Sequence, residues 1–62
     1  MFLKLKGKRV EKGFTQKDVA KEIGIAVQTY NGKENGKIEF SVSECIAIMK
    51  MLDCTFEELF MQ

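Results

Sequence analysis

The 62-residue sequence predicts a single small domain that is mainly helical. A chain of this length has room for one hydrophobic core, and 45% of its residues are hydrophobic, which argues against a disordered segment. Apolar residues recur at helical spacing in several stretches. Two Ser/Thr-x-x-Glu capping boxes mark helix starts. We therefore expect one domain over residues 1–62.

Two helices are predicted in the N-terminal third of the chain. The first covers residues 2–12 and ends at Gly13, which suits a left-handed helix C-cap. Thr15 opens the second helix, because Thr-Gln-Lys-Asp approximates a capping box with Asp in place of the preferred Glu. Gly24 ends this second helix.

Two further helices are predicted in the C-terminal third. The run Ser41-Val42-Ser43-Glu44 is a capping box followed by apolar residues at intervals of three and four, so a helix is expected over 42–52. The run Thr55-Phe56-Glu57-Glu58 is another capping box and opens a short helix at 56–60. The apolar residues of this short helix are expected to fold back onto the core.

Residues 25–41 leave two alternatives open. The segments 27–30 and 38–42 alternate between apolar and polar residues, and the stretch between them contains two Asn-Gly pairs, a strong hairpin signal. Local propensity thus favours a β-hairpin inside an α+β domain. Against it, hairpin loops usually have about two to five residues, and this loop would be longer. A lone hairpin also needs a partner sheet, which the rest of the chain does not supply.

Charge is divided unevenly along the chain. Residues 1–37 carry nine basic and four acidic residues, a net of +5, whereas residues 38–62 carry one basic and five acidic residues, a net of −4. This split indicates either a polyanionic partner for the N-terminal half or a solvated lysine-rich face. No apolar run approaches the roughly 18 residues of a membrane span, and no signal peptide is recognisable, so we expect a cytoplasmic protein.

The sequence offers little for catalysis or metal binding. It contains no His, and its two Cys lack the further ligands that a zinc site needs. We interpret both Cys as buried free thiols. No phosphate-binding glycine loop is present. We therefore expect no enzyme, no metal and no cofactor.

Residues 16–33 have the spacing of two helices joined by a tight turn. Ala20 lies four residues after Gln16, where a small side chain lets a second helix cross closely. Gly24 follows four residues later, where the turn needs a positive φ. Tyr30 is then the inward residue of the second helix. This is the spacing of a helix-turn-helix, whose second helix enters the DNA major groove.

Residues 4–60 resemble the helix-turn-helix domain of phage-repressor and Cro-type regulators, the lambda-repressor-like or XRE family. The motifs that carry the resemblance are Lys12-Gly13-Phe14-Thr15-Gln16, Val19-Ala20 with Ile23-Gly24-Ile25, Gln28-Thr29-Tyr30, Glu34-Asn35-Gly36-Lys37 and the tail 52–60. The resemblance implies an all-α, compact five-helix domain with a helix-turn-helix at about 16–34. It makes 27–34 the recognition helix and 35–40 a loop, in place of the hairpin.

The resemblance also implies two kinds of DNA contact. The residues on the outward recognition face, expected to contact bases, are Val27, Gln28, Asn31 and Gly32. Gln28 is the best base reader, since an amide can pair with adenine through two hydrogen bonds. Gly32 stands where the family often carries a long polar side chain, so this chain has one reader fewer. The residues expected to contact phosphate are Gln16, Thr29, Lys33, Asn35 and Lys37.

Lys33, Arg9 and Glu34 carry further expectations. Lys33 departs from the family, whose residue there is usually apolar and packs inward. Either the Lys33 stem lies along the core while its ammonium reaches a phosphate, or the helix is slightly rotated. Arg9 and Glu34 match a partly buried ion pair that ties the first helix to the end of the third.

The implied function is a sequence-specific transcriptional regulator, of phage or prophage origin, that binds a two-fold operator as a homodimer and occludes a promoter. The apolar residues suggested for a dimer patch are Met51, Phe56, Phe60 and Met61. We expect no small-molecule ligand and control by concentration, unless the chain is the N-terminal domain of a longer repressor. The alternative is an antirepressor-like protein-binding module that blocks another regulator through the acidic C-terminal half.

Overall fold

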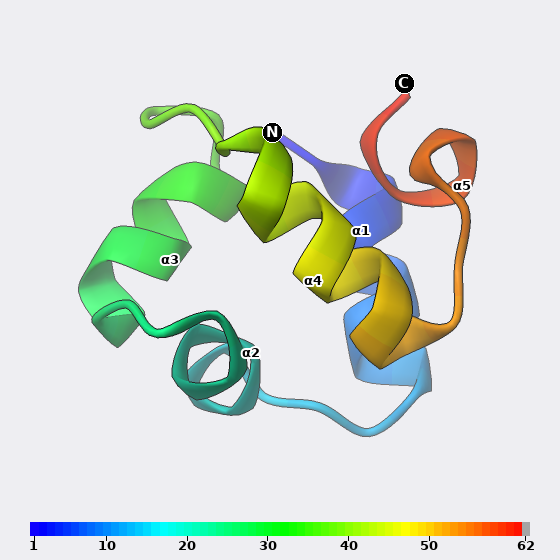
Figure 1. The fold of residues 1–62 in the computed structure, drawn as a ribbon, viewed down its shortest axis with the longest axis horizontal. Coiled ribbons are helices and arrows are strands. Elements are labelled where there is room, and N and C mark those ends of the chain that lie inside the picture. The colour runs from blue at the N-terminus through cyan, green and yellow to red at the C-terminus, as the bar shows by residue number, and fades with distance from the viewer. Residues whose placement is uncertain (62) are drawn as a thin grey trace.

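A computed structural model describes residues 1–61 and confirms the all-helical fold (Figure 1). The helices in chain order are α1 (Leu3–Glu11), α2 (Gln16–Ile23), α3 (Val27–Glu34), α4 (Val42–Leu52) and α5 (Phe56–Phe60). No strand occurs among the described residues. Each of the four helices predicted from local pattern is present, with boundaries within one residue of the prediction or equal to it.

Side-chain caps begin three of the helices where the sequence predicts them. Thr15, Ser41 and Thr55 each accept a hydrogen bond from the backbone N–H three residues further on, and the acidic side chain at that position accepts one in return. In α2 the Asp18 N–H donates to Thr15 Oγ1 over 3.0 Å, and the Thr15 N–H donates to Asp18 Oδ2 over 2.8 Å. Asp18 therefore completes the capping box in place of a glutamate.

The β-hairpin favoured by local propensity is wrong, because residues 27–34 form α3. This helix ends in a Schellman motif, in which the Lys37 N–H donates to the Gly32 carbonyl over 2.8 Å and the Gly36 N–H donates to the Lys33 carbonyl over 3.1 Å. Gly36 has a φ of 84°, as this motif requires. The second Asn-Gly pair, Asn35-Gly36, therefore forms the C-terminal cap of α3 and not a hairpin turn. Burial of Tyr30 in the core outweighs the β-propensity of the segment.

The core lies where the five helices converge. In Figure 1, α4 crosses the middle of the view, with α2 and α3 to one side and α5 to the other. α2 packs against α3 and α4, and α1 packs against α5. The buried apolar side chains are Leu5, Val19, Ala20, Tyr30, Ile48, Leu52, Leu59 and Phe60. Leu59 and Phe60 confirm that α5 folds back onto the core.

An aromatic cluster joins three distant parts of the chain. The rings of Phe2, Phe40 and Phe60 pack edge-to-face in pairs, with centroids 5.3 to 5.8 Å apart. Phe2 precedes α1, Phe40 lies in the loop before α4, and Phe60 ends α5. The cluster therefore holds the loop that follows α3 against both ends of the described chain.

None of the helices formed by residues 1–61 has the length and apolar composition that crossing a membrane requires.

Candidate nucleic-acid interface

A tight turn sets α3 across α2. Gly24 adopts a φ of 77°, and the Ile25 N–H donates to the Ala20 carbonyl over 3.0 Å, which closes the end of α2. The Ala20 side chain is buried, and α2 packs against α3. This is the helix-turn-helix arrangement predicted from the spacing of Gln16, Ala20 and Gly24.

One face of α3 is exposed and polar. Val27, Gln28 and Asn31 are exposed, and Asn35 is exposed just beyond the helix. Gln28, Asn31 and Asn35 follow one another at intervals of three and four residues, so their side chains share one face of the helix. Thr29 is half-buried beside this face. The structure therefore brings most of the predicted DNA-contacting residues of α3 onto one surface.

A chain of hydrogen-bonded amides links this face to the interior, and sequence reasoning missed it. The Gln16 Nε2 donates to Glu34 Oε1 over 3.0 Å. The Asn31 Nδ2 donates to Gln16 Oε1 over 3.1 Å, and the Asn35 Nδ2 donates to Asn31 Oδ1 over 3.1 Å. These three hydrogen bonds fix the orientation of the side-chain amides of Gln16, Asn31 and Asn35 relative to one another.

Glu34 anchors this row of hydrogen-bonded amides in the core. Its carboxylate accepts hydrogen bonds from Arg9 Nε over 2.9 Å, from Arg9 Nη2 over 3.1 Å and from the Tyr30 hydroxyl over 2.8 Å. The third guanidinium nitrogen of Arg9, Nη1, donates to the Phe14 carbonyl over 2.8 Å. The ion pair predicted from the resemblance therefore exists. It is buried, and it ties α1 to the end of α3.

The cluster shifts the ionisation of all three of its titratable groups. Burial alone raises the pKa of Glu34, but hydrogen bonds from Arg9, Gln16 and Tyr30 outweigh burial and hold this pKa below its ordinary value. The hydrogen bond to Glu34 raises the pKa of Arg9. Burial and the hydrogen bond to Glu34 raise the pKa of the Tyr30 phenol far above its ordinary value. The pair is therefore charged, and Tyr30 is neutral, at physiological pH.

The ammonium of Lys33 is paired inside the protein. Its ammonium donates to Glu44 Oε1 over 2.7 Å and to the Glu39 carbonyl over 3.0 Å, and it lies 5.9 Å from the Phe40 ring centroid. The Lys33 residue is only 8% exposed. The stem lies inward as expected, but the charge is paired inside the protein, which argues against the predicted phosphate contact. The sequence feature that pointed to this inward position is that Lys33 stands where related domains usually carry an apolar residue.

Gly32 faces the loop that follows α3. A Cβ atom built on Gly32 would lie 2.9 Å from Ile38 Cδ1 and 3.3 Å from Ile38 Cγ1. The Ile38 side chain therefore occupies the space that a side chain at position 32 would need. At this point of α3 the surface consists of the Gly32 backbone and the Ile38 side chain, and nothing in the sequence around Gly32 pointed to Ile38.

The end of α3 carries the remaining predicted phosphate contacts. Asn35 and Lys37 are both exposed, on either side of Gly36 in the Schellman motif. The hydrogen bonds of this motif fix the backbone at both positions. Lys37 is the predicted phosphate-contacting lysine whose charge is at the surface.

An apolar groove lies between α4, α5 and the loop that joins α3 to α4. The residues that line it are Phe40, Val42, Cys45, Ile46, Met49 and Phe56. Of the suggested dimer patch, Phe56 and Met61 are exposed, whereas Phe60 is buried and Met51 is half-buried. The exposed apolar surface therefore extends toward Val42 and Ile46 and excludes Phe60, because the Phe60 ring is held in the aromatic cluster.

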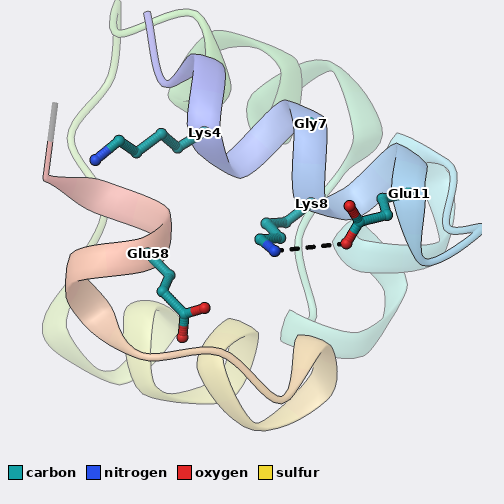
Figure 2. Close-up of a pocket in the computed structure, with 5 residues that line it drawn as sticks. All are labelled: Lys4, Gly7, Lys8, Glu11 and Glu58. Atoms are coloured by element: carbon teal, nitrogen blue, oxygen red, sulfur yellow. Dashed lines mark hydrogen bonds and ion pairs between the residues drawn. The ribbon is translucent and has the colours of Figure 1, made fainter.

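A second groove lies between α1 and α5 and has a different character. Figure 2 shows its lining, in which Lys4, Gly7, Lys8 and Glu11 lie along α1 and Glu58 faces them from α5. Lysine and glutamate side chains are balanced around it, and Lys8 already pairs with Glu11 over 3.5 Å. It contains none of the predicted DNA-contacting residues. This balance of charge gives it no preference for a polyanion.

Comparison with known proteins identifies the fold. A family model described as Helix-turn-helix matches residues 5–59, which is most of the chain and includes the whole of α2 and α3. A search of curated protein sequences finds no match.

Proposed function

Since this chain belongs to the helix-turn-helix family of the lambda-repressor and Cro (XRE) type, we propose that it represses transcription by binding a two-fold operator as a homodimer. DNA-binding transcriptional regulation is what this family does. The observation that carries the finer proposal is the exposed polar face of α3, held by the amide chain that starts at the buried Glu34.

In this proposal the exposed residues divide into base readers and phosphate contacts. Gln28 reads a base through its amide, Val27 contacts an apolar base edge, and Asn31 adds a second polar contact. Gln16, Thr29, Asn35 and Lys37 bind the flanking phosphates and set the register. Gln16 is well placed for this, because it stands at the first turn of α2, where the helix dipole and exposed N–H groups favour an anion.

The apolar groove between α4 and α5 supplies the proposed dimer contact. Its exposed side chains include Val42, which is 77% exposed, and Ile46 and Phe56, which are each 46% exposed. Apolar side chains gathered at one place on a small domain mark a site of association. In the proposed dimer, the two α3 helices occupy successive major grooves of a two-fold operator, as helix-turn-helix dimers do. A bound dimer would then occlude an overlapping promoter, as expected for a regulator of phage or prophage origin.

The experiment that tests this proposal is binding to duplex DNA over a salt series. A dimer that contacts phosphates through both protomers is expected to give a slope of log K against log salt of about −4 to −8. Sedimentation of the same samples gives the stoichiometry. No binding at low salt, or a slope near zero, would refute the DNA-binding proposal.

One observation favours a second candidate, a protein-binding module that blocks another regulator. The groove between α4 and α5 is apolar and belongs to the acidic half of the chain. The salt series separates the two candidates. A protein-binding module shows no retention of duplex DNA at any salt concentration, whereas a repressor shows steep dependence.

A further inference from the structure

We propose that Ile38, in the loop after α3, contacts a thymine methyl group in the major groove and so replaces the base contact that Gly32 cannot make. This inference rests on the proposed DNA-binding function. It assigns base specificity to a residue outside the recognition helix.

The first argument is position. Gly32 lies four residues after Gln28, so the two are stacked on one face of α3. A Cβ at Gly32 would meet Ile38 Cδ1 at 2.9 Å, which shows that the Ile38 side chain covers this point of the face. Ile38 therefore extends the surface that carries Gln28 by about one helical turn.

The second argument is that the backbone holds Ile38 in place. The N–H groups of Lys37 and Ile38 both donate to the Gly32 carbonyl, over 2.8 and 3.3 Å. On the other side, the buried Lys33 ammonium donates to the Glu39 carbonyl over 3.0 Å. A β-branched side chain on a backbone fixed at both neighbours has few rotamers available. Little conformational entropy is lost when such a side chain is buried against a ligand.

The third argument is that the fold does not use the Ile38 side chain. It is 44% exposed. Within residues 1–61 it belongs neither to the buried core nor to the partly buried apolar residues packed against that core. An apolar side chain on the proposed DNA face finds one apolar partner in the major groove, which is the 5-methyl group of thymine.

The test is a double-mutant cycle between Ile38 and thymine methyl groups. The full chain first selects a duplex from a random DNA pool, and each thymine of the recovered site is then replaced by uracil, which lacks only the methyl group. Wild type is expected to lose about four-fold in affinity per half-site at one thymine, as burial of one methyl group predicts. Ile38→Ala is expected to lose nothing further from that same replacement.

A matched control comes from Val27→Ala, which removes an exposed apolar side chain at the first turn of α3. This variant is expected to keep the full sensitivity to uracil at the Ile38-dependent thymine. If Val27→Ala abolishes that sensitivity, the contact belongs to Val27 and the inference is overturned. Equal uracil effects in wild type and Ile38→Ala would overturn it as well.

Two further measurements keep the outcomes distinct. Helical circular dichroism and urea unfolding establish that Ile38→Ala is folded. If it is not folded, Ile38→Val repeats the cycle, with a reduced uracil effect expected and an undiminished one contradicting the inference. Wild type that binds no DNA would refute the proposed function and this inference together. Wild type that binds a selected site, with a cycle that shows no coupling, would refute this inference alone.

Discussion

The guanidinium of Arg9 and the carboxylate of Glu34 form a bidentate ion pair between α1 and the end of α3. Arg9 Nε lies 2.9 Å from Glu34 Oε2, and the two side chains are 7% and 2% exposed. Glu34 Oε1 accepts from both Arg9 Nη2 and Gln16 Nε2. One carboxylate therefore supports both the packing of the core and the arrangement of the proposed DNA face.

Glu34→Gln is expected to destabilise the protein by about 3–5 kcal/mol, because it leaves the Arg9 charge buried without a partner. A domain of this size has only a few kcal/mol of stability, so this variant should be largely unfolded. Urea unfolding followed by circular dichroism measures the loss. The control is Glu11→Gln, which removes the exposed pair with Lys8 seen in Figure 2 and should cost less than about 0.5 kcal/mol. Similar losses in both variants would contradict this account of Glu34.

Stability is expected to fall in acid, and the same carboxylate contributes to this fall together with Glu44, where hydrogen bonds from Lys33 and Ser41 outweigh burial and also lower the pKa. The hydrogen bonds from Arg9, Gln16 and Tyr30 outweigh burial and hold the pKa of Glu34 below its ordinary value in the folded state. The unfolded chain therefore binds a proton first as the pH falls. The free energy of unfolding should change little between about pH 8 and about pH 5 and should then decrease. Urea midpoints across this range measure the effect, and a midpoint that rises toward acid would contradict it.

Two helical glycines offer a matched pair of substitutions. Gly7 lies inside α1, and a Cβ there would meet nothing within 4 Å, so Gly7→Ala should stabilise by about 0.5–1 kcal/mol. Gly32 lies inside α3, but a Cβ there meets the end of the Ile38 side chain, which must move. Gly32→Ala should therefore gain less than Gly7→Ala. When Ile38→Ala is also present, the two glycine substitutions should give equal gains. Urea unfolding of Gly7→Ala and Gly32→Ala, each with and without Ile38→Ala, tests this coupling.

Much of the fold was predictable because its signals are local. Capping boxes at Ser41 and Thr55 need only four residues of sequence, and both begin helices in the structure. Gly24 was equally predictable from the spacing of the turn. α3 was not, since its residues favour extended backbone locally and become helical through the burial of Tyr30. The spacing of Gln16, Ala20 and Gly24, together with the family resemblance, predicted this helix against the β-propensity of its own residues.

One interaction of the candidate site was predictable from the sequence, and the hydrogen-bond network around it was not. The Arg9–Glu34 pair followed from the resemblance, and the structure shows it. The pairing of Lys33 with Glu44 could not be predicted, because Glu44 lies in another helix and its role in the capping box already accounted for a carboxylate at that position. Ile38 was missed because its contact with Gly32 depends on the path of the loop after α3.

Lys37 and Lys33 are expected to differ in the salt dependence of DNA binding. Lys37 is exposed, so Lys37→Gln should reduce the magnitude of the salt slope by about one for each protomer bound. The ammonium of Lys33 is paired with Glu44 over 2.7 Å, so Lys33→Met should leave the slope unchanged while lowering stability. Binding titrations at several salt concentrations, with the folded fraction determined for each variant, make the comparison. A slope reduced equally by both changes would restore Lys33 as a phosphate contact.

Gln28→Ala is expected to separate specific from non-specific DNA binding. Gln28 is exposed on the polar face of α3, and its side chain takes no part in the amide chain of Gln16, Asn31 and Asn35. Its loss should therefore leave the phosphate contacts intact. The variant should lose about 1–3 kcal/mol of binding free energy on a selected duplex and little on random duplex. Asn31→Ala is the contrasting variant, because it breaks the links to both Gln16 and Asn35 and should weaken binding to both duplexes. Equal losses on the two duplexes for Gln28→Ala would show that Gln28 does not read a base.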